Sequence, residues 1–125
     1  MVNNQGILAQ NKATQNKVTA VFAALTDPTR RRIMTRLSSQ GELPVNALSQ
    51  PFRISPPAIS RHLRVLEKAR LIQRRHEGRL HLIRARAAGL EEAKTWITQC
   101  AAGWAFSFDN LNQLLKNEQR QGKRP

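Results

Sequence analysis

Residues 55–66 bring together side chains that suit two different tasks. Ile59, Leu63 and Leu66 recur at the spacing of one apolar helix face. The positions between them carry small polar and basic side chains, which donate hydrogen bonds to anionic or polar partners. The start of such a helix adds unpaired backbone N–H groups and the positive end of the helix dipole, both of which attract phosphate. The pattern predicts a helix held by a scaffold on one side and offering donors on the other.

The chain as a whole is strongly basic. It has 125 residues, and its 21 lysines and arginines against 8 acidic residues give a formal net charge of +13. Such a surface repels itself unless a polyanion covers it, and nucleic acid or an anionic membrane is the usual candidate. No apolar stretch approaches the roughly 20 residues that span a bilayer. The short apolar run at 18–25 is more typical of an amphipathic helix than of an export signal, so we expect a cytoplasmic location and no membrane partner.

The sequence lacks the residue patterns needed for disulfides, thiolate metal sites or enzyme active sites. Cys100 is the single cysteine, so one chain can form neither a disulfide nor a cluster of thiolate metal ligands. Paired carboxylates with a base, a phosphate-binding glycine loop and a nucleophile spaced from a base are also missing, so we expect no enzyme and no cofactor. Cys100 lies on an apolar stripe and is interpreted as a packing residue, with a thiol switch across a dimer axis as the alternative.

The elements that would position residues 55–66 follow from caps and periodicity. Residues 1–16 are rich in Asn and Gln and are expected to be a tail, or an arm that orders on a partner. Apolar residues at helical spacing predict a first helix over 18–25. Asp27 and Pro28 then form a cap and a first turn, and the second helix is expected to end near 38–40, before Gly41.

Three further elements complete this part of the chain. A short third helix is expected over about 44–50, ended by Pro51. Ser55 caps the fourth helix, whose first position is Pro56. Extended runs at 71–75 and 79–84 flank Gly78 and predict a β-hairpin, in which Leu80 and Leu82 alternate with polar neighbours and Ile83.

A long helix is predicted over about 88–116. Its apolar stripe runs for about eight turns, longer than the core of one small domain covers, so part of it should pack against a second copy of the chain. The stripe consists of Leu90, Ala93, Ile97, Cys100, Trp104, Phe108, Leu111 and Leu115. Trp96 and Phe106 lie off this stripe and strengthen the same inference. We therefore expect one domain over 17–116 and a basic tail over 117–125.

Helices followed by a hairpin, in this order, are typical of a mainly α winged helix-turn-helix. The quoted residues also resemble a known family, the ArsR-type regulators. The resemblance rests on Leu-Thr-Asp-Pro-Thr-Arg-Arg-Arg-Ile at 25–33, Ser-Pro-Pro-Ala-Ile-Ser-Arg-His-Leu-Arg-Val-Leu at 55–66 and Glu-Gly-Arg at 77–79. It spans about 18–115 and implies a homodimeric prokaryotic repressor that binds double-stranded DNA, with the first and last helices at the dimer interface.

The resemblance also implies roles for individual residues. The fourth helix would enter the major groove through Ser55, Pro57, Ser60, Arg61 and His62, and the residue pattern adds Ala58 and Arg64 to this outward face. The wing would contact DNA through Arg75, His76 and Arg79. The predicted dimer interface comprises Val18, Phe22, Ile97, Cys100, Trp104, Phe108 and Leu111.

Several of these residues have a simpler interpretation. Ser55 is alternatively a helix cap without a DNA contact, and an arginine on an amphipathic helix is often exposed to solvent without a binding partner. His62 lies one turn before Leu66 and is either a DNA contact or a half-buried brace. The arginines at 30–32 oppose the dipole of their own helix, which indicates a phosphate partner or an acidic neighbour.

The chain departs from the metal-sensing members of that family. The segment at 42–48, which matches their cysteine motif, has neither Cys nor His, and the last helix has Glu91, Glu92 and Asp109 but no histidine. Transition-metal sensing needs convergent nitrogen or sulfur ligands, so no metal is expected. The chain is either an autorepressor without a ligand or a sensor of an organic effector between its terminal helices.

Three functions are compatible with these features of the sequence. The favoured one is a dimeric repressor of a palindromic operator whose half-site centres are about 10 base pairs apart, acting by excluding polymerase. The alternatives are a non-specific nucleoid-associated or RNA-associated basic protein and a protein-interaction module of a larger complex.

Overall fold

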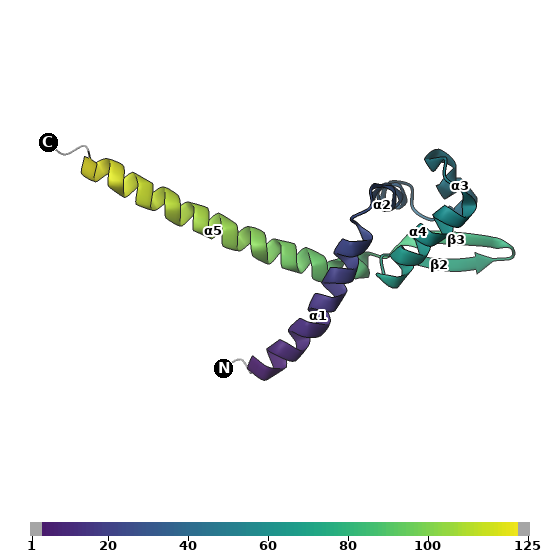
Figure 1. The fold of residues 1–125 in the computed structure, drawn as a ribbon, viewed down its shortest axis with the longest axis horizontal. Coiled ribbons are helices and arrows are strands. Elements are labelled where there is room, and N and C mark those ends of the chain that lie inside the picture. Colours follow the sequence, from purple (N-terminus) through teal and green to yellow (C-terminus); the bar gives the residue numbers. More distant parts are fainter. Residues whose placement is uncertain (1–3, 123–125) are drawn as a thin grey trace. The chain divides into compact units, whose positions relative to one another are not determined.

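The computed structural model describes residues 4–122, and the side chains of 12–119. It consists of two compact units, Met1–Ala93 and Lys94–Pro125. The elements follow the predicted mainly helical order of a winged helix-turn-helix (Figure 1). They are α1 (Asn4–Ala24), α2 (Pro28–Gln40), β1 (Leu43–Pro44), α3 (Val45–Ser49), the 3-10 turn η1 (Gln50–Phe52), α4 (Pro56–Lys68), β2 (Ile72–Glu77), β3 (Leu80–Ala85), the 3-10 turn η2 (Ala87–Leu90) and α5 (Glu91–Gly122).

Both terminal helices are longer than the sequence predicts. α1 begins at Asn4 instead of near residue 18, and α5 continues to Gly122 instead of ending near 116. Residues 4–16 include Ala, Gln, Lys and Leu, which are good helix formers, so low hydrophobicity alone does not end the helix. The remaining residues of the two expected tails, 1–3 and 123–125, lie outside the described part of the chain.

The second helix forms as its residues predict. Asp27 has extended backbone and its carboxylate accepts from the N–H of Arg30 at 3.0 Å, which satisfies one of the N–H groups exposed at a helix start. Gly41 ends the helix with a φ of 76°, and its N–H donates to the carbonyl of Leu37. Ile33, Met34 and Leu37 are the buried residues, as their spacing indicates.

The sheet contains one strand more than the predicted hairpin. β1, which is two residues long, pairs antiparallel with β3 in the order β1-β3-β2. The hairpin turn is Gly78-Arg79, with a φ of 61° at Gly78, one residue later than the expected 76–78 connection. Alternation along β3 also differs from expectation, because Ile83 is fully buried and Leu80 is 49% exposed. Helices α2 and α3 contact β3, and α4 contacts β2, whereas residues 75–81 around the turn are exposed.

One core anchors α4. Ile59, Leu63 and Leu66 are 3%, 0% and 0% exposed and pack in a cluster with buried side chains of α1, α2, α3 and both long strands. Burial of such side chains contributes about 1.5 to 3 kcal/mol each. The outward face of α4 is therefore fixed in direction by the three residues behind it.

The second unit has a different character. Within 94–119 only Cys100 is even half-buried, and every other side chain is exposed. Large apolar side chains here include Trp96, Ile97, Trp104, Phe106, Phe108, Leu111, Leu114 and Leu115. Across residues 4–122, no helix combines the length and the apolar character needed to cross a membrane.

Gly89 makes a close backbone contact that no other residue permits. A Cβ atom built on it would lie 1.8 Å from the carbonyl oxygen of Arg70, which is backbone and cannot move aside cheaply. Gly89→Ala should destabilise the fold by about 1 to 3 kcal/mol in urea denaturation. Gly103→Ala is the control, because its Cβ would meet nothing within 4 Å and alanine favours a helix by up to about 1 kcal/mol. Equal stability of the two variants would contradict this contact.

Candidate nucleic-acid interface

The exposed face of α4 is a row of basic residues. Arg61, Arg64 and Lys68 are all exposed and follow one another at helical spacing, with Pro57 a turn earlier. Within the described part of the chain, neither Arg61 nor Arg64 has an acceptor for its guanidinium. Lys68 continues the row and was not among the residues that the sequence pattern selected, although its i, i+4 spacing from Arg64 is the signal that finds it. The row is a surface of uncompensated positive charge.

The N-terminal end of α4 lacks the unpaired backbone N–H groups expected of a helix start, because its first two residues are prolines and the next two N–H groups donate to Ser55. The hydroxyl of Ser55 accepts from the N–H of Ala58 at 3.3 Å, so Ser55 is the cap that its type predicts. Ser55, Pro57 and Ser60 are exposed, whereas Ala58 is half-buried. The two prolines at 56–57 donate no hydrogen bond. The side chains at this end are small, so the surface of a binding partner can approach the helix closely.

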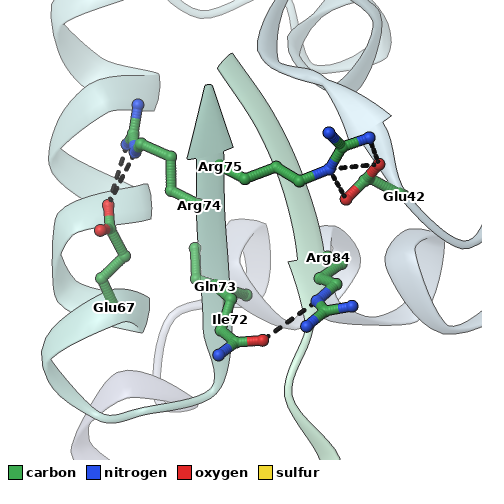
Figure 2. A pocket seen from close by; sticks show the side chains of 7 residues that line it. All are labelled: Glu42, Glu67, Ile72, Gln73, Arg74, Arg75 and Arg84. Carbon is green, nitrogen blue, oxygen red and sulfur yellow. Dashed lines mark hydrogen bonds and ion pairs between the residues drawn. The ribbon is translucent and has the colours of Figure 1, made fainter. Parts of the chain in front are cut away.

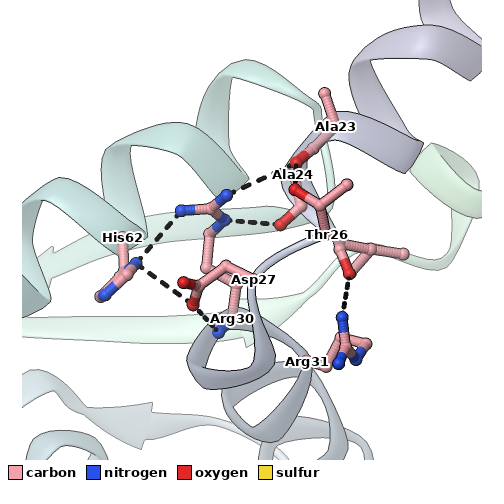
Figure 3. Close-up of polar contacts among 8 residues, drawn as sticks. Ala23, Ala24, Thr26, Asp27, Arg30, Arg31 and His62 are labelled. Atoms are coloured by element: carbon pink, nitrogen blue, oxygen red, sulfur yellow. Dashed lines mark hydrogen bonds and ion pairs between the residues drawn. The ribbon is translucent and has the colours of Figure 1, made fainter.

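His62 is bound from behind by α2. Nη1 of Arg30 lies 3.2 Å from Nδ1 of His62, and Oδ2 of Asp27 lies 3.8 Å from the same nitrogen (Figure 3). The side chain of His62 is 20% exposed, so the ring is largely covered. Of the two interpretations of His62, the structure supplies the contacts of a brace, and a DNA contact would have to use the other ring nitrogen.

Arginines at the start of α2 compensate the end of α1. Arg30 donates to the carbonyls of Ala23 and Ala24, and Arg31 donates to the carbonyl of Leu25 at 2.7 Å (Figure 3). The last carbonyls of a helix lack partners within the helix and carry its negative dipole end. The expected phosphate or acidic neighbour of these arginines is thus replaced, for Arg30 and Arg31, by the C-terminus of a helix. Arg32 is exposed.

Asp27 is kept ionised by the same group of contacts. The backbone N–H of Arg30 lowers the pKa of the Asp27 carboxyl, the charges of His62 and Arg30 act in the same direction, and partial burial opposes them. A carboxyl with a lowered pKa stabilises the fold fully above its ordinary pKa and loses that contribution as the pH falls through the lowered value. The cap of α2 therefore works at neutral pH.

Some arginines of the wing form ion pairs with glutamates, and others have no acidic partner within the described part of the chain. Arg75 donates to Glu42 at 2.7 Å, and Arg74 donates to Glu67 of α4 at 2.9 Å (Figure 2). Arg75 also lies 3.4 Å from Glu77. The hydrogen bond from Arg75 lowers the pKa of Glu42. Arg79, at the turn, is exposed and has no such acceptor among the described residues. Of the predicted wing contacts, Arg79 therefore carries an uncompensated charge and Arg75 does not.

The pocket drawn in Figure 2 is lined by three arginines and two glutamates, and each arginine is bound to a side chain of the protein. It holds about 390 Å³, and its lining residues are Glu42, Glu67, Ile72, Gln73, Arg74, Arg75 and Arg84. Its arginines all donate to side chains of the protein, with Arg84 bound to Gln73 at 3.0 Å. An anion would have to displace those acceptors, so this pocket does not attract phosphate strongly.

A second groove joins α4 to the wing. It holds about 530 Å³ and is bordered by Ser60 of α4, by Asn46 and Ser49 of α3 and by Arg79 and His81 of the wing. His81 pairs with His76 across the hairpin, with ring centroids 4.3 Å apart. The groove makes the exposed face of α4 and the wing tip two borders of one surface.

The residues predicted for the dimer interface fall into two groups. Val18 is 8% exposed, so it is already covered within a single chain, and Phe22 is 37% exposed. Ile97, Trp104, Phe108 and Leu111 are exposed in the second unit, by 49%, 68%, 64% and 50%. Cys100 is a half-buried thiol.

Among the described residues, no three His, Cys, Asp or Glu side chains come together as metal ligands.

Comparison with known proteins decides the family. Residues 27–74 match the model described as "Bacterial regulatory protein, arsR family". The chain is 34% identical over 97 residues to the HTH-type transcriptional regulator Rv2034 of Mycobacterium tuberculosis, covering 78% of this chain and 87% of that protein. This chain belongs to the arsR family. It is also 32% identical over 77 residues to the transcriptional repressor SdpR of Bacillus subtilis, covering 62% of this chain and 84% of SdpR.

Solved structures of arsR-family regulators share the fold. An ArsR-like transcriptional regulator from Rhodococcus sp. RHA1 has a TM-score of 0.68 and 28% identity, covering 82% of this chain and 95% of that one. The homodimeric winged helix-turn-helix DNA-binding domain Mb0332 from Mycobacterium bovis has a TM-score of 0.58 and 28% identity, covering 74% and 84%. The chain is thus a DNA-binding transcription regulator with a winged helix-turn-helix, and the family membership confirms that it is not an enzyme.

The contact between Arg30 and His62 predicts the tautomer of the ring. A guanidinium only donates, so Nδ1 must accept and the neutral ring carries its proton on Nε2. Nitrogen-15 NMR above the titration range of the ring should show the Nε2–H form. In Arg30→Leu the donor is lost and the carboxylate of Asp27, 3.8 Å away, should draw the proton to Nδ1. His76, which lies against His81, is an internal reference in the same spectra. An Nδ1–H ring in the unsubstituted protein would refute the contact.

Proposed function

We propose that this arsR-family regulator is a homodimeric repressor, or an autorepressor, that binds a palindromic operator through α4 and the wing. The observation that carries the proposal is the row of unpaired basic side chains on α4, a helix whose direction is fixed by three buried residues. A helix fits the major groove when one face is held by a scaffold and the other offers donors to bases and phosphates. Two copies on a symmetric dimer would read half-sites whose centres are about 10 base pairs apart.

The proposed DNA contacts divide between bases and phosphates. Ser55 and Ser60, with Pro57 and Ala58 beside them, are small enough to let the start of α4 approach base edges. Arg61 would reach a base, for which bidentate contact with guanine is the common mode, and Arg64 a base or a phosphate. His62 would donate from Nε2, since Arg30 occupies its other nitrogen.

The wing is proposed to contact the neighbouring backbone of the same duplex. Arg79 has the uncompensated charge for this task, and His76 lies two positions before the turn. Among the wing candidates, Arg75 is expected to contribute least to DNA binding, because a phosphate contact would require its guanidinium to break ion pairs with Glu42 and Glu77. The groove that borders both Ser60 and Arg79 supports one continuous DNA surface.

The dimer interface is proposed to include the apolar stripe of α5 together with Phe22 of α1. Exposed apolar side chains of this number and size mark an interaction surface on a protein of 14.2 kDa. The homodimeric state of Mb0332, which has the same fold, supports self-association over another partner. Val18 would contribute only its exposed edge, since it is already buried within one chain. A regulator of transcription meets its DNA in the prokaryotic cytoplasm, which is the location we propose.

Arg61 is expected to provide sequence preference. Arg61→Ala should lower affinity for the DNA upstream of the protein's own gene by about 1 to 3 kcal/mol, and affinity for random duplex by less. Titrations by fluorescence anisotropy on both duplexes, with footprinting of the upstream fragment, measure the two effects. Arg86→Ala is the matched control, because Arg86 is an exposed arginine outside the proposed surface and the change in charge is identical.

The same titrations test the proposed function against its alternative. A repressor should prefer its operator to random duplex by at least about 10³-fold, and its affinity should fall by roughly 10³ to 10⁵ between 50 and 200 mM salt. Equal affinity for upstream DNA, random duplex and RNA would instead identify a non-specific basic protein. Equal losses in Arg61→Ala and Arg86→Ala would remove Arg61 from the base-reading set.

Trp104 is expected to lie near the centre of the dimer interface. It is 68% exposed in one chain, and burying a tryptophan there would contribute strongly to association. Trp104→Glu should convert the dimer to a monomer of 14.2 kDa in light scattering at micromolar concentration. Gln113→Glu adds the same charge to an exposed position on the opposite side of α5 and should remain dimeric. A monomeric unsubstituted protein would overturn the dimer and favour a different protein partner.

A further inference from the structure

Two exposed arginines at the ends of α4 have left-handed backbone. Arg53, two residues before the Ser55 cap, has a φ of 51° and a ψ of 36°, and Arg70, two residues after Lys68, has a φ of 61°. They are the non-glycine residues with positive φ in the described part of the chain. This conformation disfavours any residue with a Cβ by about tenfold in the folding equilibrium, and glycine avoids that penalty. Arginine at both positions therefore calls for an explanation.

The conformation of Arg70 is explained by its backbone. Its N–H donates to the carbonyl of Glu67 and the next N–H, of Leu71, donates to Leu66, both at 3.0 Å, which closes α4 in a Schellman motif. Leu66 and Leu71 are fully buried and make the apolar contact of that motif. The backbone carbonyl of Arg70 also packs against Gly89. Nothing in these contacts uses the guanidinium, so glycine would serve equally well.

Arg53 differs in what surrounds it. It follows the 3-10 turn η1 and precedes Ile54, a residue partly buried against the core, so the chain must turn sharply here to start α4. Its guanidinium is exposed and has no hydrogen bond or ion pair within the described residues. Residues held in sparsely populated φ/ψ regions are common at functional sites, where binding by the side chain offsets the unfavourable conformation of the backbone.

We propose that Arg53 binds a backbone phosphate of the DNA beside the major groove that α4 enters. The inference rests on the proposed function, because it takes the start of α4 as the end that approaches the duplex. Recognition helices contact bases through their N-terminal residues, so the segment just before Ser55 passes the edge of the groove, where phosphates lie. A guanidinium without an internal acceptor suits phosphate, with which it forms paired hydrogen bonds. Arg70, at the opposite end of α4, lies away from that edge and has no such role.

The pair of arginines supplies its own matched control. Arg53→Gly and Arg70→Gly remove the same charge and relieve the same backbone conformation. Both should raise the thermal unfolding midpoint by about 4 °C. Only Arg53→Gly should weaken binding to a 30-base-pair duplex of random sequence, by about tenfold per bound protomer, and reduce the slope of log affinity against log salt by about 0.9 per protomer. Arg53→Lys keeps the charge and should retain most of that slope.

Each result is decisive. A duplex-binding protein in which Arg53→Gly and Arg70→Gly bind alike would overturn the role of Arg53 and leave the proposed function intact. Failure of the unsubstituted protein to bind any duplex would overturn both. Loss of binding in Arg53→Gly with a lowered unfolding midpoint would show that Arg53 supports the fold instead, whereas loss of binding with a raised midpoint supports the phosphate contact.

Discussion

The guanidinium of Arg30 donates to carbonyl oxygens at the end of α1 and to the ring of His62 on α4. Its backbone N–H is at the same time the donor that Asp27 caps, so one residue connects the end of one helix, the start of the next and the middle of a third. The last carbonyls of α1 would otherwise need water or another donor at a partly buried junction. The position of α4, the helix proposed to face DNA, therefore also depends on where α1 ends, because Arg30 braces from behind the helix whose buried residues direct its outward face.

This connection explains why Arg30 and Arg31 are tolerated at the start of a helix. Positive charge there opposes the dipole of α2, yet it lies beside the negative end of α1, and the second dipole compensates the first. Sequence reasoning sees only the helix to which the arginines belong. It predicts an unfavourable charge and looks for an outside partner, because the geometry that brings the end of α1 alongside Arg30 and Arg31 is set by the turn at Thr26 and Asp27.

The parts that could be predicted are those whose signals are local. Caps at Asp27 and Ser55, the stop at Gly41 and the apolar spacing of α4 depend on neighbouring residues, and each forms as expected. Pairing of β1 with β3 joins residues about 40 positions apart in a strand too short to show alternation, so no local pattern reveals it. The ion pair of Arg75 with Glu42, 33 positions away, is likewise non-local, and that of Arg74 with Glu67 forms only because a strand returns beside the helix before it. A count of charges gives +13 but cannot tell which arginines are already satisfied.

The apolar stripe of α5 connects folding with the concentration of the protein. A helix whose side chains at 94–119 find almost no cover within one chain gains little from packing, and helix propensity alone stabilises it weakly. In the proposed dimer, the partner subunit supplies that cover, so formation of α5 and association contribute to the same free energy. Operator binding then requires two chains to meet before two half-sites can be filled. For an autorepressor this makes occupancy depend on roughly the square of the chain concentration at low levels, which gives a threshold for repression without any effector.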